Sequence, residues 1–351
     1  MRQSNAKRKP SIADVAAAVG VSKTTISRYL HGEYDYMSLQ TKERIRKVIE
    51  ELGYRPNRVA QILKATRSNI IGVVIADISN PFSSQLLKGI QTECREQGIQ
   101  LLISDADNSP KVERTAMESL MDSQVDGLIV NTAGDNDDFL IDFATTPGNP
   151  PMATLDRVLL PLVCDGVSTD NAGGVRLMMD HLVSQGFDYV AFVVRPPSGI
   201  TSRLTRIHAV EDYLERHGGD GTGDAAGRIE GETLIYDRTR NELPRLLKDL
   251  GDRQRGRRIC LFANNEETLQ DVLYACEEND CDDLALCTFG SENTRFTRSG
   301  ITCLDQQPSL MGRTCARKLI GRIRSTDKEP FSLTEIPTEL HVYPSTAAFP
   351  V

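Results

Sequence analysis

Apolar positions recur at helical spacing near the start of the chain. Residues 12–19 carry one such pattern, with Asp14 in the first turn, where a helix dipole favours an acid, and Gly20 directly after it. Ser22 is suited to cap a second segment, residues 23–30, which repeats the spacing. The pattern predicts two short helices joined by a tight turn that contains glycine.

A third helix is predicted between Ser38, its expected cap, and Gly53, its expected end. Apolar residues recur there at i, i+3, i+4 and i+7 from Ile45 onward. After a proline, Asn57 can cap one or two further turns that end near Lys64. About seven residues are too few for a stable isolated helix in water. If this segment is helical, a partner chain, DNA or both must hold it.

The rest of the chain follows a different pattern, in which short apolar runs alternate with amphipathic segments. Repeated units of strand and helix imply parallel sheets with helices on both faces. Ligands then bind at the carboxyl ends of the strands, between lobes. The expected strands are 70–75, 100–104, 127–131, 189–194, 258–262 and 284–289, and the first helices of this region are 82–97 and 112–122.

The charges are divided unevenly along the 351 residues. Residues 1–67 hold 14 Lys and Arg against 6 Asp and Glu, whereas the remainder holds 27 bases and 43 acids. A basic head on an acidic body indicates that the head binds a polyanion and the body does not, with a solvated charge run as the plain alternative. No stretch approaches the roughly 20 apolar residues of a membrane-spanning helix.

Two further features bear on the cellular compartment. The basic first residues are not followed by the apolar segment of a secretory signal. Eight cysteines are scattered along the chain without a CxxC pair. This distribution favours reduced thiols in a cytoplasmic protein over a disulfide framework or a zinc finger.

The first two helices match the helix-turn-helix, a unit whose second helix enters the major groove of DNA. In that second helix Ile26 and Leu30 are four residues apart and are expected to face the core. Arginine can pair with guanine through two hydrogen bonds, and short hydroxyls suit phosphates or base edges. The side chains left outside are Lys23, Thr24, Ser27 and Arg28.

Three segments in the right order and spacing resemble the lactose-repressor (LacI/GalR) family. They are SIADVAAAVGVSKTTISRYLHG at 11–32, GYRPNRVAQILK at 53–64 and NIIGVVIADISNPFSSQLLKGI at 69–90, and a weaker likeness continues toward the C-terminus. The resemblance implies an all-α helix-turn-helix head followed by an α/β body. That body would have two lobes, each with a parallel sheet like those of periplasmic binding proteins.

The resemblance also divides the chain into domains. It implies a DNA-binding domain at residues 1–56, a hinge helix and linker at 57–68, and an effector-binding and dimerisation domain at 69–351. Within that last domain, the N-lobe is expected at about 69–170 and 297–331, and the C-lobe at about 171–296 and 332–351. The chain would then cross between the lobes three times, near 170, 297 and 331.

The resemblance assigns DNA contacts as well. Lys23, Thr24 and Arg28 match base-reading positions of the family. Leu63 matches the leucine that wedges into the central minor-groove step and kinks the duplex, although a buried contact in a linker is the plain alternative. The expected DNA-binding residues are Ser22, Lys23, Thr24, Thr25, Ser27, Arg28, His31, Asn57, Arg58, Leu63 and Lys64.

Polar residues at the expected strand ends match positions at which family members contact a small effector. Arg206 is the strongest of them, because a guanidinium in a closing cleft can fork onto a carboxylate or a pair of hydroxyls. At any single position, a turn-forming asparagine or a surface arginine is the plain alternative. The expected effector-binding residues are Phe82, Ser84, Asn131, Asp156, Ser202, Arg206, Asn264, Asn265 and Gln306.

This chain departs from the family at two of these strand ends. It has Asn-Asn at 264–265, where Asn-Asp is usual, and Thr-Phe-Gly at 288–290, where Gly-Phe-Asp is usual. Both changes remove acids near the cleft, while Arg195 and Arg203 lie close to Arg206 in the sequence. The chain also has no Trp to stack on a pyranose. We therefore expect an anionic effector, such as a sugar acid of the 2-keto-3-deoxygluconate or gluconate kind.

Signatures of catalysis are absent. None of the five histidines lies in an HExxH or GxSxG setting, and no phosphate-binding loop occurs. We expect no enzyme, no cofactor and no metal. The expected function is that of a cytoplasmic transcriptional regulator, a repressor of a carbohydrate or sugar-acid catabolic operon. It would bind palindromic operator DNA as a homodimer and respond allosterically to its effector. The alternative is a cytoplasmic solute-binding sensor without sequence-specific DNA binding.

Overall fold

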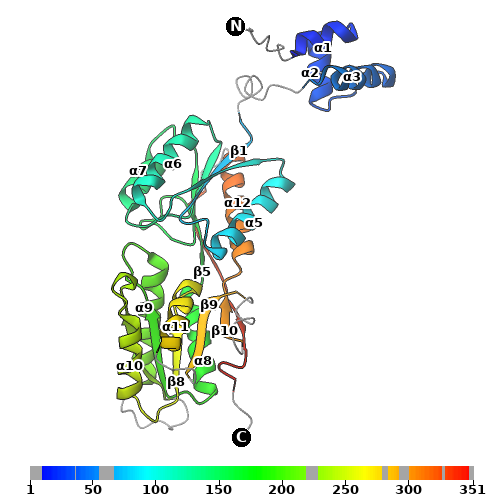
Figure 1. The fold of residues 1–351 in the computed structure, drawn as a ribbon. Helices are drawn as coiled ribbons and strands as arrows, with labels where there is room; N and C mark the ends of the chain where they lie inside the picture. Colours follow the sequence, from blue (N-terminus) through cyan, green and yellow to red (C-terminus); the bar gives the residue numbers. More distant parts are fainter. Residues whose placement is uncertain are drawn as a thin grey trace, which may run out of the picture. The chain divides into compact units, whose positions relative to one another are not determined.

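The computed structural model describes residues 10–35, 37–54, 67–218, 228–278, 284–291, 300–325 and 329–347. They belong to two compact units, Met1–Ser68 and Asn69–Val351 (Figure 1). The segment expected to form the hinge helix, with Asn57, Arg58, Leu63 and Lys64, lies outside the described residues. None of the described helices is long and apolar enough to cross a membrane.

The first unit holds the three predicted helices, α1 Ile12–Val19, α2 Lys23–Leu30 and α3 Leu39–Leu52. Helix α1 begins with a capping box, in which Ser11 and the first-turn acid satisfy each other's backbone N–H groups, and such caps contribute about 1 kcal/mol. A small apolar core joins the helices. Its buried residues are Val15, Ala16, Val19, Ile26, Ile45 and Tyr54.

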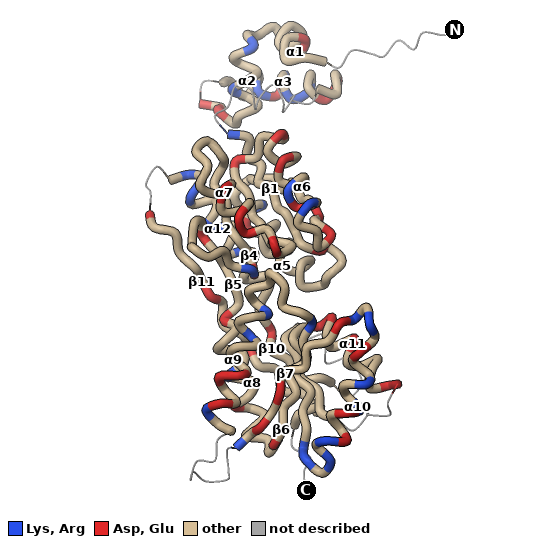
Figure 2. The backbone as a smooth tube through the Cα atoms, turned by 90° about the vertical axis from the view of Figure 1, so that its left-hand side faces the viewer, with Lys and Arg blue, Asp and Glu red and all other residues tan. Residues whose placement is uncertain are grey.

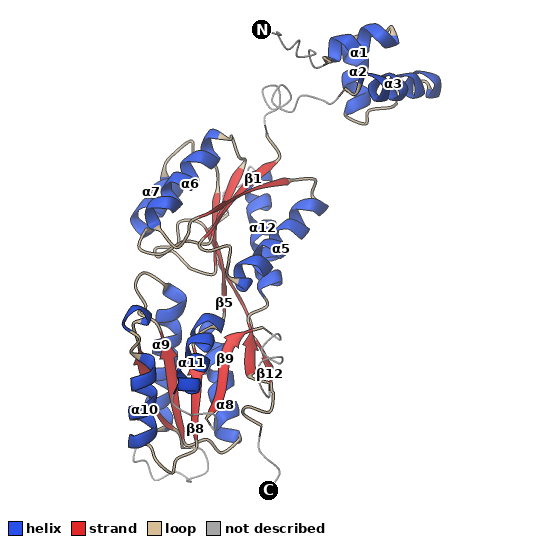
Figure 3. Ribbon diagram, viewed as in Figure 1, coloured by secondary structure: helices blue, strands red, loops and turns tan. Residues whose placement is uncertain are grey.

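The second unit contains two six-stranded sheets, one in each lobe (Figure 3). In the N-lobe sheet the order is β11-β5-β4-β3-β1-β2, and the observed pairs are all parallel. Helices α5 and α12 cover one face of this sheet, and α6 and α7 cover the other. The elements are β1 Ile70–Ile75, α5 Pro81–Glu96, β2 Gln100–Asp105, α6 Pro110–Asp122, β3 Gly127–Val130, α7 Asp137–Thr145, β4 Met152–Leu155, β5 Asp165–Thr169, α12 Pro308–Arg324 and β11 Leu333–Ile336.

The C-lobe sheet has the order β12-β10-β9-β8-β6-β7, in which only the β10–β12 pair is antiparallel. Helices α8 and α9 cover one face, and α10 and α11 cover the other. The elements are α8 Asn171–Ser184, β6 Tyr189–Val194, α9 Thr201–His217, β7 Glu230–Ile235, the 3-10 turn η1 Arg238–Arg240, α10 Leu243–Arg253, β8 Ile259–Ala263, α11 Glu266–Glu278, β9 Ala285–Gly290, β10 Thr302–Asp305 and β12 Glu339–His341.

Two of the three expected crossings between the lobes lie elsewhere. The first falls after β5, near residue 170 as expected. The second falls between β10 and α12, rather than near 297, because β10 pairs with β9 in the C-lobe sheet. The third falls between β11 and β12, rather than near 331, because β11 pairs with β5 in the N-lobe sheet. The local sequence of a short apolar strand does not indicate which sheet the strand joins, because this depends on the strand with which it pairs.

The charge division along the sequence is visible along the fold. Figure 2 shows Lys and Arg interspersed with Asp and Glu along both α3 and α6, so the division appears in the balance of charges and not helix by helix. On α3, Arg46 is held between Glu43 and Glu50 by ion pairs of 2.5 and 2.9 Å, so part of the basic charge of the head is neutralised locally. Lys23 and Arg28 on α2 are exposed.

Candidate functional site

Helix α2 presents the seven described DNA-binding candidates on itself or at its ends. Ser22, Lys23, Thr24, Arg28 and His31 are exposed, whereas Thr25 and Ser27 are half-buried. This separation follows from the helical period, because Ile26 points into the core between them.

Three of these side chains also make local hydrogen bonds. Ser22 caps α2 by accepting from the backbone N–H of Thr25 at 3.1 Å, and the two hydroxyls lie 2.9 Å apart. The Nδ1 of His31 lies 2.7 Å from the carbonyl oxygen of Ser27. These contacts fix the ends of the helix, so the side chains left to reach a partner are those of its outer face.

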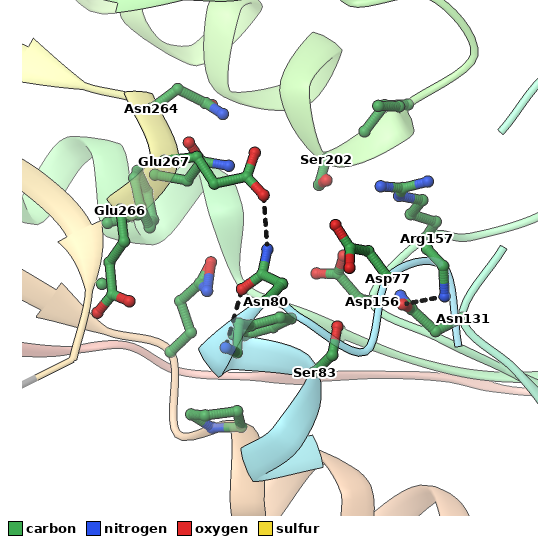
Figure 4. Close-up of a pocket in the computed structure, with 18 of the residues that line it drawn as sticks. Asp77, Asn80, Ser83, Asn131, Asp156, Arg157, Ser202, Asn264, Glu266 and Glu267 are labelled. Atoms are coloured by element: carbon green, nitrogen blue, oxygen red, sulfur yellow. Dashed lines mark hydrogen bonds between the residues drawn. The ribbon is translucent and has the colours of Figure 1, made fainter. Parts of the chain in front are cut away.

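A cleft between the two lobes forms the second candidate site (Figure 4). Its walls include eight of the nine effector-binding candidates, namely Phe82, Asn131, Asp156, Ser202, Arg206, Asn264, Asn265 and Gln306. Ser84 was predicted wrongly. It is exposed and does not line the cleft, whereas the preceding Ser83 is buried and does, since one residue turns a helix by about 100°.

Four helices begin at this cleft, α5, α9, α11 and α12. In parallel strand–helix units the helix follows the carboxyl end of its strand, so the helix N-termini gather where the strands end. Helix N-termini carry partial positive charge and N–H groups that attract anions. Asn80 caps α5 by accepting from the N–H of Phe82 at 2.9 Å, but no side chain caps α9 or α12.

Arg206 lies buried at the base of the cleft and joins three segments. Its Nε donates to Oδ1 of Asn171 at 2.7 Å, its Nη1 donates to the carbonyl oxygen of Asn264 at 2.6 Å, and its Nη2 donates to Oε1 of Gln306. Its guanidinium also stacks on Phe289, 3.7 Å from the ring centroid. Burial lowers the pKa of Arg206 to about 10, although the negative charge of a nearby aspartate opposes this shift.

Two further arginines line the cleft and have few partners. The Nη1 of Arg157 donates to the carbonyl oxygen of Thr132, and its buried Nε has no hydrogen-bond partner. Nη1 of Arg203 donates to the carbonyl oxygen of Pro196 at 2.9 Å. Burial lowers the pKa of Arg157. Burial also lowers the pKa of Arg203, to about 10, and the positive charges of Arg157 and Arg195 add to this shift.

Four carboxylates also line the cleft, and three of them are committed to other groups. Asp77 accepts from the N–H and hydroxyl of Ser79 at 2.8 and 2.6 Å, and these and other hydrogen bonds lower its pKa. Glu266 accepts from the N–H and hydroxyl of Ser291 at 2.8 and 2.7 Å. Glu267 pairs with Nη1 of Arg195 at 2.8 Å.

Asp156 is the fourth carboxylate, and its environment differs. It follows β4 at a φ of 70° and no described side chain donates a hydrogen bond to it. Burial raises the pKa of Asp156, although Arg157, Arg206 and Arg203 act in the opposite direction. This carboxylate is therefore available to a ligand hydroxyl.

The charge of the cleft is more balanced than the sequence predicts. Arg195 was expected to add positive charge, but Glu267 and Asp271 bind it at 2.8 and 2.7 Å. Gly290, at the position of the missing family aspartate, leaves room for Glu266, whose Cγ would lie 2.9 Å from a Cβ built there. Arg157 and Arg203 are the cleft-lining arginines that keep most of their N–H groups free of protein acceptors.

Some residues of the cleft lie in the expected strand-end segments but outside the expected effector-binding set. Asp77 and Asn80 follow β1, and Arg157 follows β4 directly after a predicted residue. The signal that could have found them is the one used for their neighbours, the end of a parallel strand.

Comparison with known proteins adds the following findings. Residues 11–57 match the family model for bacterial regulatory proteins of the lacI family. Residues 68–221 match that for periplasmic binding proteins and the sugar binding domain of the LacI family, and residues 179–346 match that for a periplasmic binding protein-like domain.

Three individual proteins illustrate the similarity. HTH-type transcriptional regulator PtxS of Pseudomonas aeruginosa is 32% identical over 96% of this chain and 95% of its own length. PtxS of Pseudomonas plecoglossicida is 40% identical over 62% of this chain, and the match spans 63% of that relative. The crystal structure of the Lac repressor dimer bound to operator and the anti-inducer ONPF has a TM-score of 0.78 at 22% identity, covering 97% of this chain and 100% of the other.

Proposed function

We propose a specific role for this chain, which belongs to the lacI family of bacterial regulatory proteins and is therefore a DNA-binding transcriptional regulator and not an enzyme. It represses a carbohydrate or sugar-acid catabolic operon. An anionic sugar derivative controls its affinity for operator DNA. The observation that carries the proposal is the cleft between the lobes. There, unpaired arginines and uncapped helix N-termini surround polar strand ends, whereas three of the four carboxylates are already engaged.

The head supplies the proposed DNA contacts. Lys23, Thr24 and Arg28 on the outer face of α2 would read bases in the major groove, and Ser22, Thr25, Ser27 and His31 would contact the backbone. By resemblance to the family, Asn57, Arg58, Leu63 and Lys64 would form the minor-groove contacts of the hinge. Such a regulator works in the cytoplasm, where it meets the operator.

A homodimer is part of the proposal. The Lac repressor structure is described as a dimer bound to operator, and a palindromic operator mirrors the two-fold axis of its protein. The N-lobe of this chain offers an apolar surface for pairing. Leu102 and Ile103 on the edge strand β2 are 39% and 43% exposed, and Ile78, whose N–H donates to Asp105 at the end of that strand, is 46% exposed. An exposed apolar edge of this kind is a site of association.

The regulatory coupling follows from linkage. The effector would favour one lobe-to-lobe arrangement, and the operator would favour the arrangement in which the two hinge segments pair. A ligand shifts this balance only by its difference in affinity for the two forms. The cleft is suited to this role because groups from both lobes line it, so closure changes what the ligand touches.

Two measurements on the full chain test the proposal. Gel shift with palindromic DNA should show sequence-specific binding that weakens steeply with salt, and Leu63→Ala should reduce operator affinity while leaving effector affinity nearly unchanged. Isothermal titration should show binding of gluconate, 2-keto-3-deoxygluconate or glucuronate in preference to glucose and ribose. Binding of the neutral sugars alone would contradict an anionic effector, and absence of specific DNA binding would favour a sensor without a DNA-binding role.

A further inference from the structure

We propose that Arg157 and Arg203, one from each lobe, form a two-part clamp for the acid group of the effector, so that the lobes close fully only around an anion. This inference rests on the proposed function and specifies which residues of the cleft take the acid group. It assigns that role to two residues outside the expected effector-binding set and gives Arg206, the strongest candidate from sequence, a different task.

The two arginines face the same space from opposite lobes. Arg157 follows β4 of the N-lobe sheet, and Arg203 lies in the first turn of α9 in the C-lobe. Their neighbours are in direct contact, since the N–H of Val158 donates to Oγ1 of Thr201 at 3.1 Å across the cleft. In Figure 4 the side chain of Arg157 extends toward Ser202, the residue before Arg203.

Both guanidinium groups retain most of their donors. Each donates one hydrogen bond within the protein, Arg157 to the carbonyl oxygen of Thr132 and Arg203 to that of Pro196. The Nε of Arg157 is buried without an acceptor, and an unsatisfied buried donor costs about 1–3 kcal/mol. An anion with two or three oxygens is the ligand that satisfies several N–H groups of each guanidinium at once.

Electrostatics gives the same answer. Neither Arg157 nor Arg203 forms an ion pair within the part of the chain that the structure describes, whereas the neighbouring Arg195 has Glu267 and Asp271. The positive charges of Arg157 and Arg195 bear on Arg203, whereas the carboxylates of Asp156, Glu113 and Glu267 attract Arg157, and burial strengthens these interactions by removing water. The lowered pKa of Arg203, caused first by burial and then by Arg157, is the expected signature of this crowding. An anion between the two groups replaces repulsion with two attractions.

The start of α9 completes the clamp. No side chain caps this helix, and its first-turn residues Ser202 and Arg203 line the cleft. The helix N-terminus adds positive potential and N–H groups at the same point. Asp156 lies next to Arg157 with an unengaged carboxylate, which fits the hydroxyl-bearing part of the same ligand.

Arg206 is less suited to be the principal anion ligand because three of its five N–H groups already donate within the protein. Its Nε, Nη1 and Nη2 each donate to a protein acceptor, and its face is covered by Phe289. The chemistry required of the ligand is a carboxylate or a phosphate on a polyhydroxylated carbon chain. A sugar acid and a sugar phosphate both meet this description, so the test must separate them.

The test compares ligands that differ only in the acid group. Gluconate is matched with glucitol, and glucuronate with glucose, while 6-phosphogluconate and glucose 6-phosphate form the phosphate arm. Affinities are measured by isothermal titration on the full wild-type chain and on Arg157→Met and Arg203→Met. The control is Arg216→Met, which makes the same change in the same helix as Arg203 at an exposed site, with only Asp212 at 3.7 Å as ion-pair partner.

We expect Arg157→Met and Arg203→Met each to lose roughly 30-fold or more in affinity for the bound acid. Their affinity for the matched neutral compound should not change. Arg216→Met should bind every ligand as the wild type does. Because each clamp variant removes one hydrogen bond to a carbonyl oxygen, their melting temperatures should stay within a few degrees of that of the wild type, which separates lost binding from lost folding. In small-angle scattering, the acid should compact the wild type but neither clamp variant.

The outcomes separate the clamp from the proposed function. Acid affinity and compaction that persist in both variants would overturn the clamp while leaving a sugar-acid effector in place. A wild type that binds no acid, or only glucose and glucitol, would overturn both. Tighter binding of 6-phosphogluconate than of gluconate, with the same sensitivity to Arg157→Met and Arg203→Met, would support the clamp and identify its ligand group as a phosphate.

Discussion

The three arginines of the cleft show how partners, rather than residue type, decide a role. Arg206 holds acceptors from three segments of the C-lobe. Arg157 and Arg203 each make a single hydrogen bond to a carbonyl oxygen and form no ion pair among the described residues, although nearby carboxylates attract both. Arg206 therefore stabilises the lobe without a ligand. Arg157 and Arg203 instead raise the free energy of the empty cleft, because their N–H groups lack acceptors that a bound anion would supply.

Arg206→Met should destabilise the body. It leaves Oδ1 of Asn171, Oε1 of Gln306 and the carbonyl oxygen of Asn264 without a donor, and each unsatisfied buried acceptor costs about 1–3 kcal/mol. We expect the free energy of unfolding to fall by about 3 kcal/mol or more in urea titrations, with loss of the effector response. Arg157→Met, measured alongside, should show no such fall, and equal destabilisation by both would contradict the division of roles.

At this scale the sequence reveals position but not partners. Eight of nine expected effector residues line the cleft because the carboxyl ends of parallel strands lie at the same edge of a sheet. This rule can be applied from the sequence pattern alone. Ser84 was wrong because the strand-end rule does not specify which face of the following helix turns inward. That Arg195 is neutralised by Glu267 and Asp271 could not be foreseen, since those acids lie about 70 residues away in the chain.

Among the elements, the crossing of α5 and α12 does most to position the cleft, because both helices begin there. The two helices approach so closely that side chains are excluded at the crossing. A Cβ on Gly89 would lie 2.0 Å from the carbonyl oxygen of Ser309, and a Cβ on Gly312 would lie 2.1 Å from that of Leu86. Both contacts involve backbone atoms, which cannot rotate away.

Two glycines of α12 test this crossing with one substitution. Gly312→Ala should separate the helices and lower the free energy of unfolding by about 1–3 kcal/mol, the usual range for overpacking. Gly321→Ala has nothing within 4 Å of its new Cβ and should stabilise the helix by up to about 1 kcal/mol, because alanine favours helices over glycine. Chemical denaturation measures both, and the same sign for the two variants would contradict the packing described here.

The same helix pair should make the body sensitive to acid. Burial would raise the pKa of Glu93 on α5, but hydrogen bonds from Arg317 and Arg313 on α12 hold it below the ordinary value of 4.5. A carboxylate with a lowered pKa in the folded state stabilises it above the unfolded pKa, and this contribution is lost as pH falls. Unfolding free energies should therefore decrease from pH 5 to pH 3.

The responsible group can be identified by substitution. Glu93→Gln should flatten the loss of stability below about pH 4.5, since the side chain no longer takes up a proton on unfolding. Glu96→Gln changes a carboxylate on the same helix that is 48% exposed, and surface pairs contribute little. An unaltered acid slope in Glu93→Gln would show that other carboxylates determine it.

Elements proved more predictable than their assembly. The three helices of the head and the six expected strands follow local periodicity, and their bounds agree with the structure to within one or two residues, whereas β4, β5 and β7 were not expected. The assignment of β10 and β11 to lobes failed because it depends on pairing with β9 and β5, which lie elsewhere in the chain. Local pattern specifies a strand, whereas the hydrogen-bonded neighbour specifies its sheet.

For the whole molecule, the decisive question is how the two lobes of the body meet. The lobes contact each other both within the cleft and outside it. In the cleft, Nδ2 of Asn80 donates to Oε1 of Glu267 at 3.2 Å, and outside it the loop after β3 packs against the loop before α9. At that second contact a Cβ on Gly199 would lie 2.2 Å from Oδ1 of Asp135 and 2.4 Å from its backbone nitrogen. The arrangement of the lobes in this structure therefore requires glycine at this position.

Gly199→Ala should selectively disfavour closure. Its φ of +61° strains any side chain, so the matched control is Gly98→Ala, which has a φ of +70° but open space around its Cβ. Both variants should lose similar stability, whereas only Gly199→Ala adds a clash of about 1–3 kcal/mol to the closed form. Because apparent affinity falls with the population of the binding-competent form, the effector concentration that changes operator binding should rise roughly tenfold or more. Gel shift with increasing effector measures it, and identical titrations for the two variants would mean that the liganded protein does not close through this contact.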